Sequence, residues 1–199
     1  MRSFSIAASA LLLATRLAAQ GSALDYLDDA SLRRASGPRD QAAAHASRGD
    51  RLLAKAEKLE REAEAAAGDP KLAAKAGKAF EQALAAYAAA LRKDPSFREG
   101  HLKVGRCYLE LGQLEKAIGA CSQAWGLDPS RPDAPLCEPR AHLGLNRPRR
   151  AQEIFLLLKE RGFAEAETLL SELDCWAAEH PDNSAAQEVA RWIAQQRAS

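Results

Sequence analysis

The sequence lacks the short motifs on which recognisable active sites are usually built. It has no G-x-S-x-G nucleophile motif, no P-loop and no glycine-rich dinucleotide turn. None of its 4 cysteines forms a C-x-x-C pair, which excludes the spacing of zinc ribbons, thioredoxin-like redox motifs and haem attachment sites. Its 4 histidines share no short spacing with one another. We therefore predict a protein that is not an enzyme and that holds no metal ion or cofactor.

An excess of charge of either sign is also missing. The 199 residues include 28 Lys and Arg against 27 Asp and Glu, which gives a formal net charge of +1. A chain that binds nucleic acid through its phosphates usually carries a clear positive excess. We therefore expect no nucleic-acid partner.

Strand-like alternation of apolar and polar residues is absent as well. Apolar residues instead recur at helical spacing along most of the chain, and hydrophobic residues make up 47% of it. That content is enough for one domain with a continuous core. The pattern predicts an all-α protein.

What the sequence does contain is a period of 34 residues. Apolar and turn positions of one segment recur at equivalent positions of the next: Ala83, Tyr87, Ala90 and Pro95, then Ala117, Cys121, Ala124 and Pro129. A fixed period of this length predicts stacked helical hairpins, each of which buries its apolar face against its neighbours. Such stacks usually present a surface to a partner and rarely carry out chemistry.

The segment 98–131 explains the residue types at these positions. Val104 and Tyr108 lie four apart on one helix face, and Gly105 beside them lets a second helix approach closely. In the following helix, small alanines stand where the antiparallel partner crosses, and Cys121 fills the larger gap between them. These residues occupy the positions of W-x2-L-G-x2-Y and A-x3-F…P, and the chain resembles the tetratricopeptide repeat family over residues 40–198.

The resemblance implies a short α-solenoid of three to four antiparallel helical hairpins, wound as a right-handed superhelix. Residues 40–199 would form this helical-repeat domain. Its approximate repeats would be 40–97, 98–131, 132–163 and 164–199.

Two segments depart from the repeat pattern. Gly68-Asp69-Pro70 falls where a first helix is expected and reads as a turn followed by a helix start. It predicts two longer helices, at about 40–67 and 70–93. Further on, Pro139 stands where a glycine is expected, so we expect the helix there to begin late or to kink.

In the resembled family, the first helices of successive repeats line a concave groove that receives a peptide or a partner helix. Lys103 and Arg106 are three apart and could hold an acidic group, with Leu102 and Leu109 in apolar contact beside them. The alternative is a solvated face whose leucines complete the core. The candidate groove residues are Glu99, Leu102, Lys103, Arg106, Leu109 and Glu110.

The family's clamp for a C-terminal carboxylate uses groove asparagines, and this chain has only Asn146 and Asn183, neither of them in the expected groove. We therefore expect a protein or peptide partner without that clamp, and no small-molecule ligand.

Residues 1–19 have the form of a secretory signal peptide. A short basic start is followed by an apolar run and then by small residues before Gln20. The run is too short for a membrane span, so we expect no stable span after cleavage. Residues 20–39 would form a flexible N-terminal segment. We expect an exported bacterial protein, periplasmic or secreted; the alternative for 1–19 is a frayed helix.

An oxidising compartment would permit disulfides among the cysteines. Cys121 and Cys137 lie on adjacent helices across a repeat junction and are the candidate pair. The alternative is that all 4 cysteines are small buried hydrophobic residues.

Arginines gather at one interhelical turn, at Arg147, Arg149 and Arg150. They fit either a site for an acidic peptide or phosphate, or a solvated turn beside a helix start.

The leading hypothesis is a non-catalytic interaction scaffold or adaptor of the bacterial cell envelope. The alternative is an obligate accessory subunit of an envelope enzyme or assembly complex. It would dock through an apolar C-terminal patch if Trp176 and Trp192 were exposed.

Overall fold

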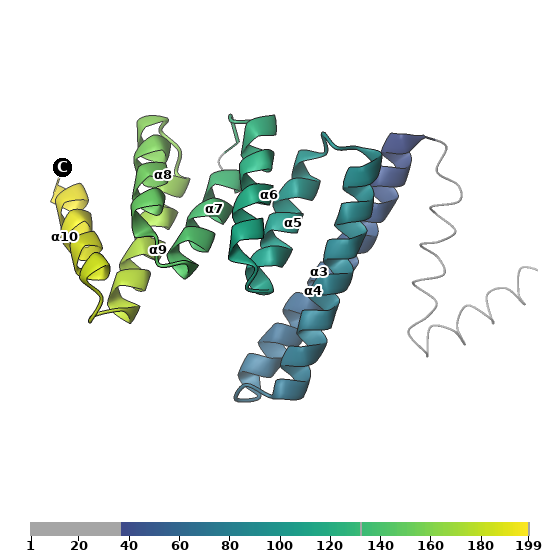
Figure 1. The fold of residues 1–199 in the computed structure, drawn as a ribbon, viewed down its shortest axis with the longest axis horizontal. Helices are drawn as coiled ribbons and strands as arrows, with labels where there is room; N and C mark the ends of the chain where they lie inside the picture. Colours follow the sequence, from purple (N-terminus) through teal and green to yellow (C-terminus); the bar gives the residue numbers. More distant parts are fainter. Residues whose placement is uncertain (1–36, 132, 199) are drawn as a thin grey trace, which may run out of the picture.

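A computed structural model describes residues 37–131 and 133–198, and the expected signal peptide and residues 20–36 lie outside this range (Figure 1). Within it, the regular structure consists of helices and includes no strand. The helices are α3 (Pro38–Ala65), α4 (Pro70–Lys93), α5 (Arg98–Glu110), α6 (Leu114–Leu127), α7 (Asp133–Gly144), α8 (Pro148–Glu160), α9 (Glu165–Glu179) and α10 (Ser184–Ala198).

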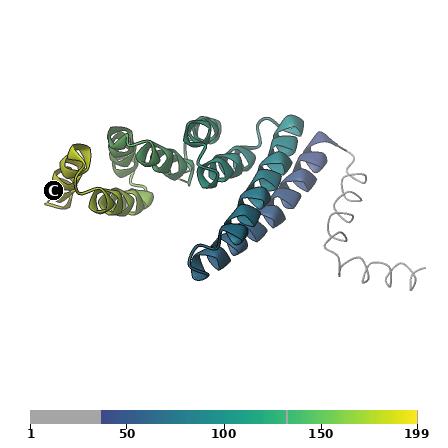
Figure 2. The ribbon, with the colours of Figure 1, turned by 60° about the horizontal axis from the view of Figure 1, so that its bottom comes forward.

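These helices form four consecutive antiparallel hairpins that stack side by side in a row (Figures 1 and 2). The first helices α5, α7 and α9 contact one another along the row, and each second helix also contacts the first helix of the next hairpin. The prediction of an all-α helical-repeat solenoid is confirmed. No helix among the described residues is both long enough and apolar enough to cross a membrane.

The first hairpin is about twice as long as the others. Helix α3 has 28 residues and α4 has 24, whereas α5 has 13, and the long hairpin extends past its neighbours in Figure 1. Gly68 takes a left-handed conformation between them, and the Asp69 carboxylate accepts a hydrogen bond from the backbone N–H of Lys71 at 2.8 Å. The predicted helix 70–93 is confirmed, while α3 begins two residues before the predicted start at 40.

Helix α7 runs from Asp133 through Pro139 to Gly144. Of the two expectations for this helix, a late start at Pro139 is therefore wrong. Pro139 is among the fully buried residues, so packing against the neighbouring helices holds the helix around it.

The recurring positions lie in the core. Each of the following is at most 1% exposed: Ala83, Tyr87, Ala90, Ala117, Cys121, Ala124, Ala151 and Phe155. Pro95 and Pro129 follow the second helices of the first two hairpins. Because most of these core residues are small, the helices pack closely, and even one added methyl group would disturb their packing.

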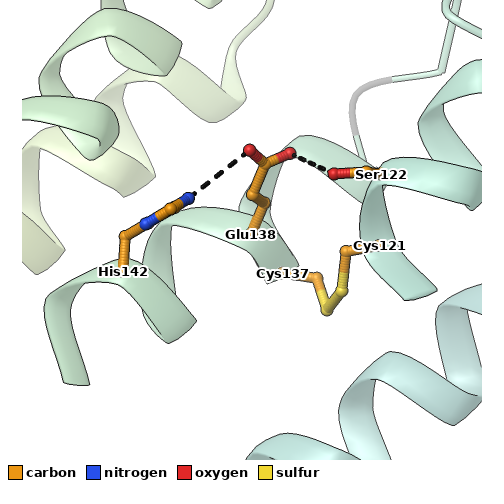
Figure 3. The surroundings of a disulfide bond; sticks show 5 residues. All are labelled: Cys121, Ser122, Cys137, Glu138 and His142. Atoms are coloured by element: carbon orange, nitrogen blue, oxygen red, sulfur yellow. Dashed lines mark hydrogen bonds and ion pairs between the residues drawn. A yellow bond between two sulfur atoms is a disulfide. The ribbon is translucent and has the colours of Figure 1, made fainter. Parts of the chain in front are cut away.

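Gly105 shows how close this packing is. A Cβ atom at Gly105 would collide with Cys121 Sγ and would lie 2.9 Å from Cys137 Sγ. The structure joins these two cysteines in a disulfide between α6 and α7, with their Cα atoms 5.9 Å apart (Figure 3). The disulfide therefore fills the space that the missing side chain of α5 leaves open, and three helices meet there.

A polar cluster centred on Glu138, which follows Cys137 in α7, lies beside the disulfide (Figure 3). The Glu138 carboxylate accepts a hydrogen bond from Ser122 of α6 at 3.1 Å and lies 3.6 Å from Nε2 of His142. Arg150 of α8 approaches the same carboxylate at 3.5 Å. Glu138 thus links three helices next to the covalent bond.

The other two cysteines are free thiols. Cys107 is fully buried, and burial raises the pKa of its thiol to about 12, which leaves it protonated and inert. Cys175 is exposed, so the alternative reading, in which all 4 cysteines are buried, is wrong for this residue.

Gly105→Ala is expected to lower the free energy of unfolding by about 1–3 kcal/mol, because the new methyl group would overpack the junction. Gly77→Ala is the matched control. Gly77 also lies inside a helix, but a Cβ atom there would meet no atom within 4 Å. The control should therefore gain up to about 1 kcal/mol in helix propensity. Urea denaturation of both variants checks this, and equal stability would contradict it.

Replacing the disulfide by Cys121→Ala/Cys137→Ala is expected to lower the free energy of unfolding by about 3 kcal/mol. Without the bond, the unfolded chain gains the conformational entropy of the loop that the bond otherwise closes. The two cysteines are 16 residues apart in the sequence. Cys175→Ala, at the exposed thiol, should change stability by less than about 0.5 kcal/mol. A double variant as stable as the parent chain would show that the bond stabilises nothing.

Candidate functional site

A cleft of about 600 Å³ lies between α3 and α5, the first helices of the first two hairpins. We call it the α3–α5 cleft. It is lined by Ala46, Asp50, Leu53, Ala54, Glu57, Tyr87, Phe97, Glu99, Lys103 and Arg106. Its volume is in the range of sites that hold a small ligand or a few residues of a peptide.

Three of the six groove residues expected from the sequence line this cleft, namely Glu99, Lys103 and Arg106. Leu102 and Leu109 are half-buried and lie outside the lining. Glu110 is exposed and also lies outside it. The structure therefore brings together three of the four charged residues of the predicted set, without Glu110 and without the leucines expected to accompany them.

The charges around the cleft differ in how far they are already paired. Arg106 forms an ion pair with Glu57 of α3 at 2.8 Å, and Glu99 pairs with Arg131. Lys103 has no ion pair within the described part of the chain, and its side chain is only half-buried. Lys103 is thus the cation in the cleft that an acidic group of a partner could meet without displacing an internal one.

The floor of the cleft is fixed by a contact between the two long helices. The Tyr87 hydroxyl donates a hydrogen bond to the Asp50 carboxylate at 2.7 Å, and its ring lies where a Cβ atom at Gly49 would collide. Burial, followed by the bond to Asp50, raises the pKa of Tyr87 far above its usual range. The hydroxyl therefore stays protonated and remains a donor at any physiological pH.

Beyond Glu57 and Arg106, toward the C-terminal ends of α3 and α5, acidic residues of the two helices lie near one another. Burial raises the pKa of Glu60, and the nearby carboxylates of Glu110 and Glu64 raise it further. Arg106, the ion-pair partner of Glu57, lowers the pKa of Glu60 but does not cancel the effect of burial and of the like charges. Glu110, a predicted groove residue, therefore belongs to an acidic border of the cleft.

The α3 side of the cleft was not predicted from the sequence. Its lining residues fall at positions 46, 50, 53, 54 and 57, which is the spacing of one helical face. That spacing was present in the sequence as a possible signal. It was obscured because small alanines and charged residues alternate along this face and read as a solvated helix.

The C-terminal tryptophans do not form an exposed patch. Trp176 is 7% exposed and stacks on His180. Trp192 is half-buried, with its ring edge-on to Phe155 at 5.2 Å between centroids. The apolar surface on which the accessory-subunit alternative depended is therefore mostly core.

No group of three His, Cys, Asp or Glu residues in 37–131 and 133–198 is placed to hold a metal ion.

Comparison with protein families identifies part of the chain. Residues 71–132 match the tetratricopeptide repeat family. The matched span covers α4, α5 and α6, and so includes the α5 side of the cleft. A comparison with curated proteins found no match. Repeats of the matched family generally mediate protein–protein interaction and typically form a non-catalytic scaffold.

Proposed function

We propose that the whole chain, beyond the matched 71–132, is a tetratricopeptide-repeat protein that acts as a non-catalytic interaction scaffold. Its partner would be a protein that places an extended segment in the α3–α5 cleft. The observation that carries this proposal is Lys103, a cation without an internal ion pair in a cleft between two first helices.

The chemistry of the cleft favours a peptide over other ligands. Leu53 and Phe97 offer apolar contact, and Lys103 offers a cation for a side-chain carboxylate. The Asp50 carboxylate can accept further hydrogen bonds, for example from backbone N–H groups of an extended segment. An extended peptide can satisfy all three kinds of group at once. Its backbone N–H groups can donate to the acceptor, an acidic side chain can pair with the cation, and apolar side chains can contact the apolar residues.

We also propose that the protein works outside the cytoplasm, in the bacterial cell envelope or beyond it. The sequence of residues 1–19 supports this, as does the disulfide between Cys121 and Cys137, because such bonds persist in oxidising compartments. Intact-mass measurement of the exported protein should give a chain that begins at Gln20. A cytoplasmic chain that retains Met1, with Cys121 and Cys137 both reduced, would contradict this.

Site-specific cross-linking tests the cleft. Ala54, an exposed residue of the lining, is replaced by a photo-cross-linking amino acid, and Ala73, exposed on α4 outside the cleft, serves as the matched position. We expect a protein adduct from envelope extract at position 54 and none at 73.

Charge reversal then tests the role of the lysine. Lys103→Glu should weaken capture of the adducted partner about tenfold, equivalent to about 1.4 kcal/mol. Lys75→Glu, at an exposed lysine outside the cleft, should leave it unchanged. Adducts of equal yield at both positions, or capture insensitive to Lys103→Glu, would place the partner elsewhere.

A further inference from the structure

A second cleft, of about 490 Å³, lies at the opposite end of the stack between hairpins three and four. We call it the turn cleft, because the turn from α7 to α8 forms one wall and α10 forms the other. It shares no lining residue with the α3–α5 cleft. Its wall residues include Asn146, Arg147, Arg149, Arg150, Ala185 and Val189.

The two walls are joined at their base. Asn146 takes a left-handed conformation with φ of 56°, and its side-chain oxygen accepts a hydrogen bond from the Asn183 amide at 2.8 Å. This bond ties the α7–α8 turn to the α9–α10 turn. The cleft is thus held open by structure that exists without a ligand.

The arginines of the turn cleft are not equally occupied. Arg150 lies 2.7 Å from Glu153 and 3.5 Å from Glu138, so it is committed to the folded chain. Arg147 approaches Glu115 only at 3.9 Å, and both side chains are more than half exposed, so this pair contributes little. Arg149 has no ion pair within the described residues. Two guanidinium groups are therefore left for an outside anion.

The position of these arginines is unfavourable for the chain alone. Helix α8 begins at Pro148 with no acidic residue in its first turn and no side-chain cap on its N-terminus. Positive side chains at a helix start oppose the helix dipole. By contrast, α4 also begins with proline but is capped by the Asp69 carboxylate. An anion bound between the arginines would supply the missing negative charge.

The floor and far wall restrict which anion fits. Pro148 and Val189 are buried and Ala185 is half-buried, which gives the cleft an apolar base. Glu188 of α10 also lines the cleft and opposes any ligand of high negative charge. One carboxylate beside an apolar group satisfies both constraints, whereas phosphate or a nucleic acid does not. Arg149 and Arg147 would meet the carboxylate, since guanidinium and carboxylate form strong charge-assisted hydrogen bonds.

We propose that the turn cleft is a second peptide-binding site, which takes a segment with one acidic side chain next to an apolar one. The site is formed mainly by the α7–α8 turn and the second helices α8 and α10, with His142 contributed by the first helix α7. It shares no residue with the α3–α5 cleft, so a partner could occupy it while that cleft is also filled.

The test uses two blocked pentapeptides on the full mature chain. One has a central glutamate between two leucines, and the other has glutamine in its place. Backbone amide shifts are followed by NMR. The glutamate peptide should shift the amides of Arg149, Ala185 and Val189, and the glutamine peptide should bind at least about fivefold more weakly because it lacks the charge.

Three single variants make the outcome specific. Arg149→Gln should weaken binding of the glutamate peptide at least about fivefold, and Glu188→Gln should strengthen it about twofold by removing a like charge. Lys103→Gln should change nothing, so failure here is separable from failure of the α3–α5 cleft. Equal binding of the two peptides, indifference to Arg149→Gln, or shifts confined to α3 and α5 would each overturn the proposal. So would binding of inorganic phosphate in preference to the peptide.

Discussion

The close approach of three helices at Gly105 is the contact on which the rest of the stack depends. None of the four hairpins that the structure describes can bury its apolar face alone, because each consists of only two helices. Small residues at the recurring positions let the next hairpin come near enough to cover that face. At Gly105 the approach is so close that two sulfur atoms take the place of a side chain, and α5, α6 and α7 become one unit. The relative positions of both clefts follow from this joint.

The sequence was informative where residue size is dictated by helix crossings. Ala83, Ala117 and Ala151 recur because a larger side chain cannot fit at those crossings, and a regular period of such residues predicts hairpins without knowledge of the rest. Turn and helix-start residues, rather than residue size, located the turn at Gly68-Asp69-Pro70 and the helix that follows it. The sequence was less informative at Pro139, where local propensity favoured a late helix start or a kink, whereas α7 runs through this residue, which is fully buried.

The candidate cleft was only half predictable for a related reason. The α5 wall lies inside a regular repeat, so Lys103 and Arg106 could be assigned to an outward face. The α3 wall belongs to the hairpin that departs from the period, and its position is set by contacts between α3 and α4 such as Tyr87 with Asp50, 37 residues apart. Spacing along one helix does not reveal such a partner. Only the folded arrangement shows that Glu57 already neutralises Arg106 and that Lys103 is left over.

The disulfide divides the stack in a way that bears on its motions. Repeat stacks open at the interfaces between neighbouring units, each largely independent of the next. A covalent bond across the central interface holds hairpins two and three together, so breathing is confined to the outer two interfaces. The α3–α5 cleft spans one of these and the turn cleft spans the other. Each cleft can therefore widen or narrow without changing the contact between hairpins two and three. The two ends of the stack would then move independently of each other.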